Sequence, residues 1–127
     1  MSAILVDTSS WIAYFNHGEH SIIDEALREG RVYLSGLIAA ELTSGKLSPK
    51  QRSALESFLG DLPLFDDDLQ HWCRVGRLRA QLLSKGLTVS TPDAHVAQCA
   101  LDLQGDLLTQ DKIFLKIANK VALTLLH

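Results

Sequence analysis

Short apolar runs alternate with longer helical segments along the whole chain, and this alternation constrains the fold more than any other feature. The first run is continuous, as in a strand that is buried on both faces of a parallel sheet. Strands that alternate with helices predict an α/β fold with a central parallel sheet covered on both faces. The predicted strands are residues 3–6, 32–34, 62–65, 107–108 and 121–125.

Capping residues mark where the helices between these strands are predicted to begin. Ser48, Pro49 and Gln51 form a complete start signal, because serine caps, proline fits the first turn and glutamine reaches back to the cap. Similar signals predict helices that begin at or near Asp7, Ser21, Asp66, Ser90 and Asp111, and the apolar segment 36–43 adds another.

Size and composition predict one domain over residues 1–127. Hydrophobic residues make up 46% of the chain, as in globular proteins. The net charge of −3 argues against a wholly basic nucleic-acid coat. No apolar run approaches the ~18 residues of a membrane span, and no secretory leader is evident, so we expect a soluble cytoplasmic protein. Cys73 and Cys99 form no disulfide framework and are expected to be buried apolar residues.

Four acidic residues occupy places where a ligand site is expected. Asp7 directly follows the first strand and Asp111 closely follows residues 107–108, and ligands of α/β sheets bind beyond the carboxyl ends of strands. Asp93 lies in the first turn of a helix, and Glu41 interrupts an apolar helical segment. Taken singly, each aspartate could be a helix cap and Glu41 could be a solvent-facing residue. Their combination favours a carboxylate cluster.

Such a cluster requires a cation. Two like charges 5 Å apart repel by about 3 kcal/mol at an effective dielectric near 20. A divalent ion removes this cost, and ligands that are all oxygen favour Mg²⁺ or Mn²⁺ over zinc. These ions activate water and stabilise the oxyanions of phosphoryl displacement.

Four stretches of the chain resemble the motifs of PIN domains, and more narrowly those of VapC-type ribonuclease toxins of toxin–antitoxin pairs. The stretches are Leu5-Val6-Asp7-Thr8-Ser9-Ser10-Trp11-Ile12, Ala40-Glu41-Leu42, Thr91-Pro92-Asp93-Ala94-His95-Val96-Ala97 and Leu108-Thr109-Gln110-Asp111-Lys112-Ile113-Phe114. The resemblance implies a flavodoxin-like α/β/α sandwich and an endoribonuclease that depends on Mg²⁺ or Mn²⁺. It also implies a homodimer that is neutralised by a small antitoxin protein.

The resemblance also assigns roles to individual residues. Asp7 and Asp93 match the direct metal ligands, and Glu41 and Asp111 complete the metal and catalytic site. Thr109 matches a hydroxyl that holds the first acid, and Ser9 matches a small polar residue near the site. Many PIN domains carry a further Asp or Asn where this chain has Ile113, which puts a second bound metal in doubt.

RNA contacts are expected from basic side chains rather than from net charge. Arg74, Arg77 and Arg79 lie in a stretch, residues 69–92, that contains no acid, and they are the predicted RNA-binding residues. A second basic stripe on the last helix, Lys112, Lys116 and Lys120, shares one face. The alternative for both groups is an ordinary solvated helix face.

Three other functions have to be weighed against a nuclease. A phosphoacceptor signalling domain needs an acid pair near the first strand and a lysine after the last core strand, and the chain shows no such set. A dehalogenase-like phosphotransferase needs a second aspartate where Ser9 stands. A catalytically inactive PIN-like scaffold that binds RNA or protein remains the principal alternative.

Overall fold

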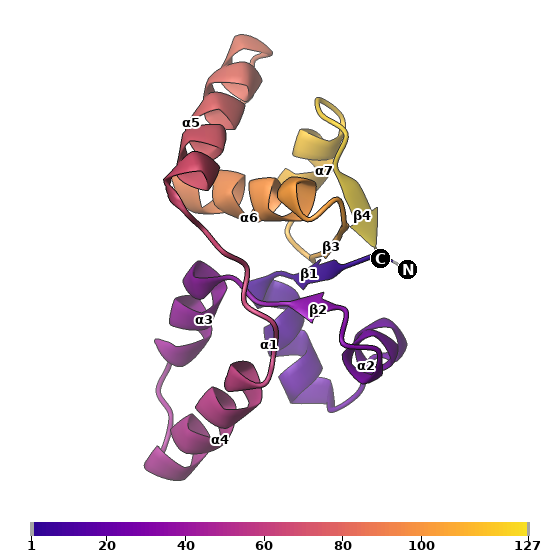
Figure 1. Cartoon of the computed structure of the whole chain (residues 1–127), viewed down its shortest axis with the longest axis vertical. Helices are drawn as coiled ribbons and strands as arrows, with labels where there is room; N and C mark the ends of the chain where they lie inside the picture. The colour runs from indigo at the N-terminus through magenta and orange to yellow at the C-terminus, as the bar shows by residue number, and fades with distance from the viewer. Residues whose placement is uncertain (1, 127) are drawn as a thin grey trace.

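The computed structural model describes residues 2–126 and consists of one parallel sheet between two groups of helices (Figure 1). The strands within this range are β1 (Ile4–Val6), β2 (Val32–Tyr33), β3 (Asp106–Leu108) and β4 (Thr124–Leu126), in the sheet order β2-β1-β3-β4. The helices are α1 (Thr8–His17), α2 (Ser21–Arg28), α3 (Gly36–Thr43), α4 (Pro49–Gly60), α5 (Leu69–Ser84), α6 (Thr91–Asp102) and α7 (Ile113–Ala118).

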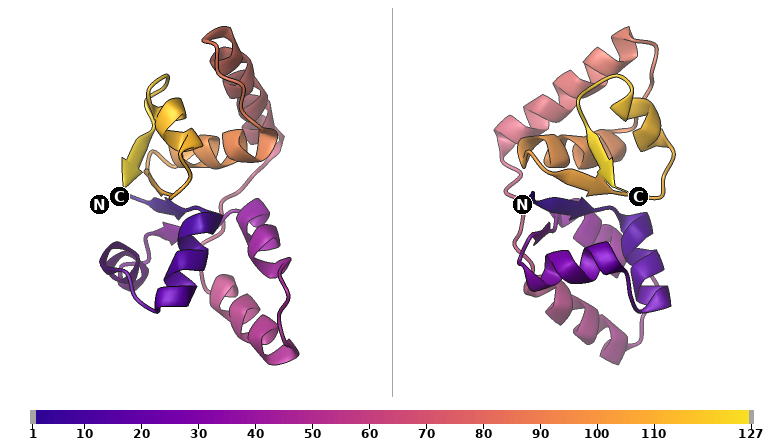
Figure 2. Two further views of the ribbon diagram at one scale, coloured as in Figure 1. Left: turned by 180° about the vertical axis from the view of Figure 1, so that it is seen from behind. Right: turned by 90° about the vertical axis from the view of Figure 1, so that its right-hand side faces the viewer.

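The sheet separates the helices into two layers. Figures 1 and 2 show α1 to α4 on one side of the sheet and α5, α6 and α7 on the other. The predicted α/β/α architecture with a central parallel sheet is therefore confirmed. Within residues 2–126, no helix combines the length and apolar character that a membrane crossing requires.

The predicted strand at residues 62–65 is wrong. Only one isolated bridge forms there, between Leu34 and Leu64. Pro63 has no N–H group with which to extend a ladder, and Leu64 is 64% exposed, so the segment lacks the burial of a core strand. The last strand is also shifted, to Thr124–Leu126 instead of residues 121–125.

β1 is the central strand that its apolar sequence predicts. Its three residues are at most 2% exposed, and Leu5 pairs with Tyr33 on one side and Leu107 on the other. Gly105 allows the close approach of the turn before β3, because a Cβ at this position would overlap the carbonyl oxygen of Ala3.

The strand order creates a switch point between β1 and β3. From β1 the chain continues to β2 on one side, and from β3 it continues to β4 on the other. In such sheets the crevice for ligands opens beyond the carboxyl ends of the two strands at the reversal. The loops that follow β1 and β3 therefore meet at this crevice.

The two cysteines differ from each other in burial. Cys99 is buried as expected, but Cys73 is exposed, which corrects the expectation for that residue. Cys99 lies beside His95 in the core between α5 and α6. Burial, together with the neighbouring His71, lowers the pKa of His95 to about 4.

Candidate functional site

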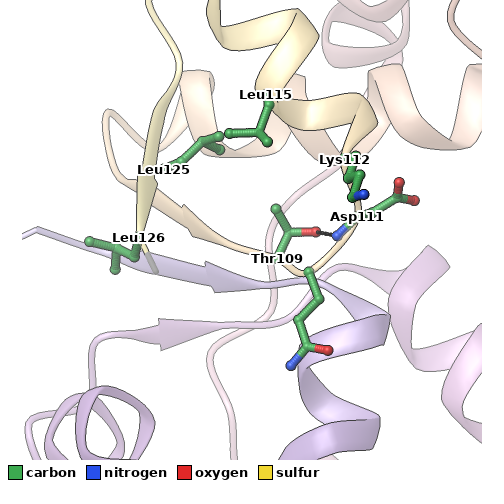
Figure 3. Close-up of a pocket in the computed structure, with 7 residues that line it drawn as sticks. Thr109, Asp111, Lys112, Leu115, Leu125 and Leu126 are labelled. Carbon is green, nitrogen blue, oxygen red and sulfur yellow. Dashed lines mark hydrogen bonds between the residues drawn. The ribbon is translucent and has the colours of Figure 1, made fainter.

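Asp7 stands at the end of β1 with both carboxylate oxygens held by neighbours. It is the N-cap of α1 and only 8% exposed. Its Oδ1 accepts a hydrogen bond from the Thr8 N–H at 2.8 Å, and its Oδ2 accepts one from the Thr109 hydroxyl at 2.9 Å. Thr109 Oγ1 also accepts from the Asp111 N–H at 3.0 Å (Figure 3). Thr109 therefore connects the acids that follow β1 and β3.

Glu41 is brought to the same edge by α3. It is exposed, and its Oε1 accepts a hydrogen bond from the Thr8 hydroxyl at 2.7 Å. Ser35, the buried N-cap of α3, fixes the start of this helix by accepting from the Ile38 N–H at 3.1 Å. Sequence reasoning did not single out Thr8, and its position next to Asp7 is the signal that could have found it.

Asp93 is not a helix cap. The cap of α6 is Ser90, whose hydroxyl accepts from the Asp93 N–H at 3.2 Å. Pro92 occupies the first turn, where its missing N–H costs nothing. The Asp93 carboxylate is therefore available for another role at the N-terminus of α6.

The four acids line one small cavity of about 130 Å³. Ser9 lies on its wall, and its hydroxyl accepts from the Gln110 N–H at 3.2 Å, which ties the loop after β3 to α1. No lysine or arginine is among the residues that line this cavity. The residues that line the cavity are Asp7, Thr8, Ser9, Leu37, Glu41, Pro92, Asp93, Val96 and Asp111.

The surroundings of Asp7 and Asp93 favour the protonated forms of these two carboxyl groups. Burial raises the pKa of Asp7; hydrogen bonds from Thr109 and Thr8 oppose this shift, while the charges of Glu41 and Asp111 add to it. Burial also raises the pKa of Asp93. The charges of Asp111 and Glu41 raise it further, and a hydrogen bond with Ser90 lowers it. Uncompensated negative charge is thus concentrated in the cavity.

The donor set fits a hard divalent cation. Carboxylate and hydroxyl oxygens are the ligands that Mg²⁺ and Mn²⁺ prefer, and no nitrogen or sulfur ligand lines the cavity. Within residues 2–126, the side chains whose ligand atoms converge as closely as one metal ion requires are His71, His95 and Cys99 in the core, and the four acids do not form such a group. A cation between the carboxylates would offset their mutual repulsion.

A second pocket adjoins the acidic cavity and shares Asp111 with it. This pocket has a volume of about 230 Å³ and is lined in part by Leu115, Leu125 and Leu126. Figure 3 shows the Asp111 carboxylate pointing away from these leucines. This pocket, which Thr109, Gln110 and Lys112 also line, thus flanks the acidic cavity on the side of Asp111.

The predicted RNA-binding arginines do not gather at the acidic cavity. Arg74 pairs with Asp102 at the last residue of α6, and Arg79 donates to the Val89 carbonyl at 2.9 Å. Arg74 and Arg77 line an open groove of about 430 Å³ that shares no residue with the acidic cavity.

Comparisons with known proteins agree with this fold. The model of the PIN domain family matches residues 4–120. A comparison with curated proteins found no match.

Solved structures provide further similarity. A structure of VapBC2 from Rickettsia felis, bound to a DNA fragment from their promoter, matches with a TM-score of 0.78 and 22% identity over 98% of this chain and 97% of that chain. DNA-bound VapBC from Salmonella typhimurium matches with a TM-score of 0.76 and 23% identity, over 99% and 98% of the two chains. VapBC-5 from Mycobacterium tuberculosis, a member of the VapBC family of toxin–antitoxin systems, matches with a TM-score of 0.68 and 23% identity. This match covers 100% of this chain and 99% of that chain. At these identities the likeness shows a shared fold.

Proposed function

The chain belongs to the PIN domain family, and on that premise we propose that its acidic cavity is the active site of a metal-dependent endoribonuclease. The observation that carries the proposal is the meeting of Asp7, Glu41, Asp93 and Asp111 around one cavity at the switch point of the sheet. Four carboxylates without a basic partner are costly as a structural device but suit a cation site.

The chain's own residues would hold the ion and orient the substrate. Asp7 and Asp93 are the proposed direct ligands, and Glu41 and Asp111 complete the site. Thr109 and Thr8 fix the rotamers of Asp7 and Glu41 through their hydroxyl groups. A bound Mg²⁺ or Mn²⁺ would supply an activated water and offset the charge that develops on the phosphate oxygens.

We further propose that the nuclease is the toxin of a toxin–antitoxin pair and acts in the cytoplasm as a homodimer. Three of the structures that this chain resembles over nearly its whole length are VapBC structures, and one of these is described as a member of the VapBC family of toxin–antitoxin systems. An antitoxin would cover the acidic cavity, using a basic side chain to compensate the carboxylates. Growth arrest by the free chain, relieved by the co-expressed partner, would support this role.

Incubation of the purified chain with total RNA, with and without Mg²⁺ or Mn²⁺, tests the activity. Metal-dependent cleavage at internal sites is the expected result. RNA binding without cleavage in every metal would instead identify the chain as an inactive PIN-like scaffold, the alternative function.

A further inference from the structure

A second group of metal-capable side chains lies in the core between α5 and α6. His71, His95 and Cys99 are each 0% exposed, and their candidate ligand atoms all lie within 4.8 Å of one another. Among residues 2–126, these three residues are the one group of at least three histidine, cysteine, aspartate or glutamate side chains whose ligand atoms lie so close together. None of the three lines the acidic cavity.

The three ligand atoms form a compact triangle. His71 Nε2 lies 2.8 Å from His95 Nδ1, and Cys99 Sγ lies 3.8 Å from each of these nitrogens. A tetrahedral Zn²⁺ with ordinary bond lengths separates its nitrogen and sulfur ligands by about 3.6 Å and two nitrogens by about 3.4 Å. Cys99 Sγ also lies 3.4 Å from His95 Nε2, so the His95 ring has to turn before its Nδ1 and the sulfur can face one ion. The two nitrogens must also move apart by roughly 0.6 Å to reach this geometry.

A network of hydrogen bonds orients His71 for such a role. Its Nδ1 lies 2.8 Å from Asp102 Oδ2, which leaves Nε2 facing the triangle. Asp102 also accepts from Arg74 Nε and Nη2, at 3.0 and 2.9 Å, and from Gln98 Nε2 at 2.9 Å. A carboxylate behind a histidine, itself anchored by other donors, is the arrangement that fixes metal-ligating imidazoles in proteins.

Aromatic rings enclose the group. Trp72 stacks on His95 with ring centroids 4.6 Å apart, and Phe65 meets His71 edge-on at 4.8 Å. Shielding from water strengthens the attraction between a cation and its ligands. The pairing of one thiol with two imidazoles selects a borderline-soft ion rather than the hard ions suited to the acidic cavity.

We propose that His71, His95 and Cys99 form a Zn²⁺ site that is separate from the nuclease site. Without metal, the proton between the two facing nitrogens keeps them at hydrogen-bond distance. When Zn²⁺ binds, that proton moves to Nε2 of His95 and the Cys99 thiol loses its proton to solvent, so one proton is released for each ion. The bound ion would connect the first turn of α5 to the middle of α6.

Zn²⁺ binding has to supply the free energy that forms the buried thiolate of Cys99. Burial raises the pKa of the Cys99 thiol, so the sulfur stays protonated until a metal displaces the proton. The positive charge that Zn²⁺ and the thiolate together bring into the core is opposed by the Asp102 carboxylate behind His71.

Titration of the chelator-treated full chain with Co²⁺ tests the site, because a cobalt–thiolate bond gives a near-ultraviolet charge-transfer band and carboxylate ligands do not. We expect this band at one Co²⁺ per chain, and we expect Zn²⁺ to abolish it. Cys99→Ala should lose the band, whereas Cys73→Ala, which removes the exposed cysteine of α5, should retain it. Asp102→Asn should weaken Zn²⁺ binding about 10- to 100-fold.

The spectrum of the unmodified chain keeps the test independent of variant folding. Absence of a thiolate band in that chain would overturn the proposal. His71, His95 and Cys99 would then be buried residues that only connect α5 and α6 through hydrogen bonds. A band that persists in folded Cys99→Ala would overturn it as well. Neither result depends on nuclease activity, so the acidic cavity is tested separately.

Discussion

The Thr109 hydroxyl donates a 2.9 Å hydrogen bond to Oδ2 of Asp7, across 102 positions of sequence and between the ends of adjacent strands. The same hydroxyl oxygen accepts from the Asp111 N–H. Thr109 therefore orients the most buried acid of the cavity and fixes the loop that carries another.

Thr109→Val keeps the shape of the side chain and removes both hydrogen bonds. We expect the pKa of Asp7 to rise further, because one hydrogen bond that opposes the effect of burial is lost. Metal affinity should fall about 10- to 100-fold, as for other partners of metal ligands. Metal-dependent thermal stabilisation measures this change. Thr124→Val, on the exposed end of β4, is the matched control and should leave it unchanged.

The metal-free protein should respond to pH in the direction set by Asp93. A carboxyl whose pKa is raised by folding binds protons more tightly in the folded state, so its contribution to stability is lost as pH rises through the raised pKa. In EDTA, the stabilities of Asp93→Asn and the parent should therefore converge below pH 3.8, the ordinary pKa of an aspartate, and the variant should become the more stable protein towards pH 7.

The gain combines the burial of the Asp93 carboxylate with its repulsion by Asp111 and Glu41. Each like-charged pair contributes at most about 3 kcal/mol at 5 Å and a dielectric near 20, and water reduces this contribution. Urea unfolding at several pH values measures the difference. Equal stability of the two proteins across this range would show that Asp93 experiences no repulsion in the cavity.

Arg74 and Arg77 should separate structural from RNA-binding roles. Arg74 makes a two-point ion pair with Asp102, so Arg74→Ala should lower the free energy of unfolding, because it leaves the Asp102 carboxylate without its guanidinium partner. Arg77 is exposed, and Arg77→Ala should leave stability unchanged. If Arg77 contacts a phosphate, this variant should also reduce the salt slope of RNA binding by about 1. A salt slope equal to that of the parent would remove Arg77 from the RNA interface.

The ends of the cleaved RNA report on the nucleophile. Attack by an activated water on phosphorus leaves a 5′-phosphate and a 3′-hydroxyl, and it does not require the ribose 2′-hydroxyl. We expect these ends when products are mapped by ligation and by phosphatase sensitivity. Main products with 2′,3′-cyclic phosphates would show that the 2′-hydroxyl attacks instead.

Much of the site could be predicted because parallel strands align their carboxyl ends. Asp7 and Asp111 follow β1 and β3 in sequence, and the sheet order then makes them neighbours. The strand expected at residues 62–65 failed because apolar character alone does not account for the missing N–H of Pro63. Side-chain contacts between different helices could not be predicted from local sequence patterns. His71 contacts Asp102, which lies 31 positions further along the chain, and no periodicity within either helix predicts that contact.

The ion pair between Arg74 and Asp102 could not be predicted from the sequence for the same reason. An arginine in a stretch without acids suggests a free basic face, but its partner Asp102 lies 28 residues further along the chain, on another helix. Residue spacing within α5 describes only one side of this contact. The three-dimensional arrangement therefore narrows the set of arginines available to RNA.

The initial rate of RNA cleavage by Asp93→Asn, compared with the parent in saturating Mn²⁺, tests the central claim most directly. Asparagine preserves the shape of the side chain and leaves the Ser90 cap of α6 intact, but removes one proposed ligand charge. The rate should fall at least about 100-fold, while Asp61→Asn, on the exposed turn after α4, should cleave like the parent. Cleavage by folded Asp93→Asn at a rate close to that of the parent would contradict the assignment of the acidic cavity as the active site.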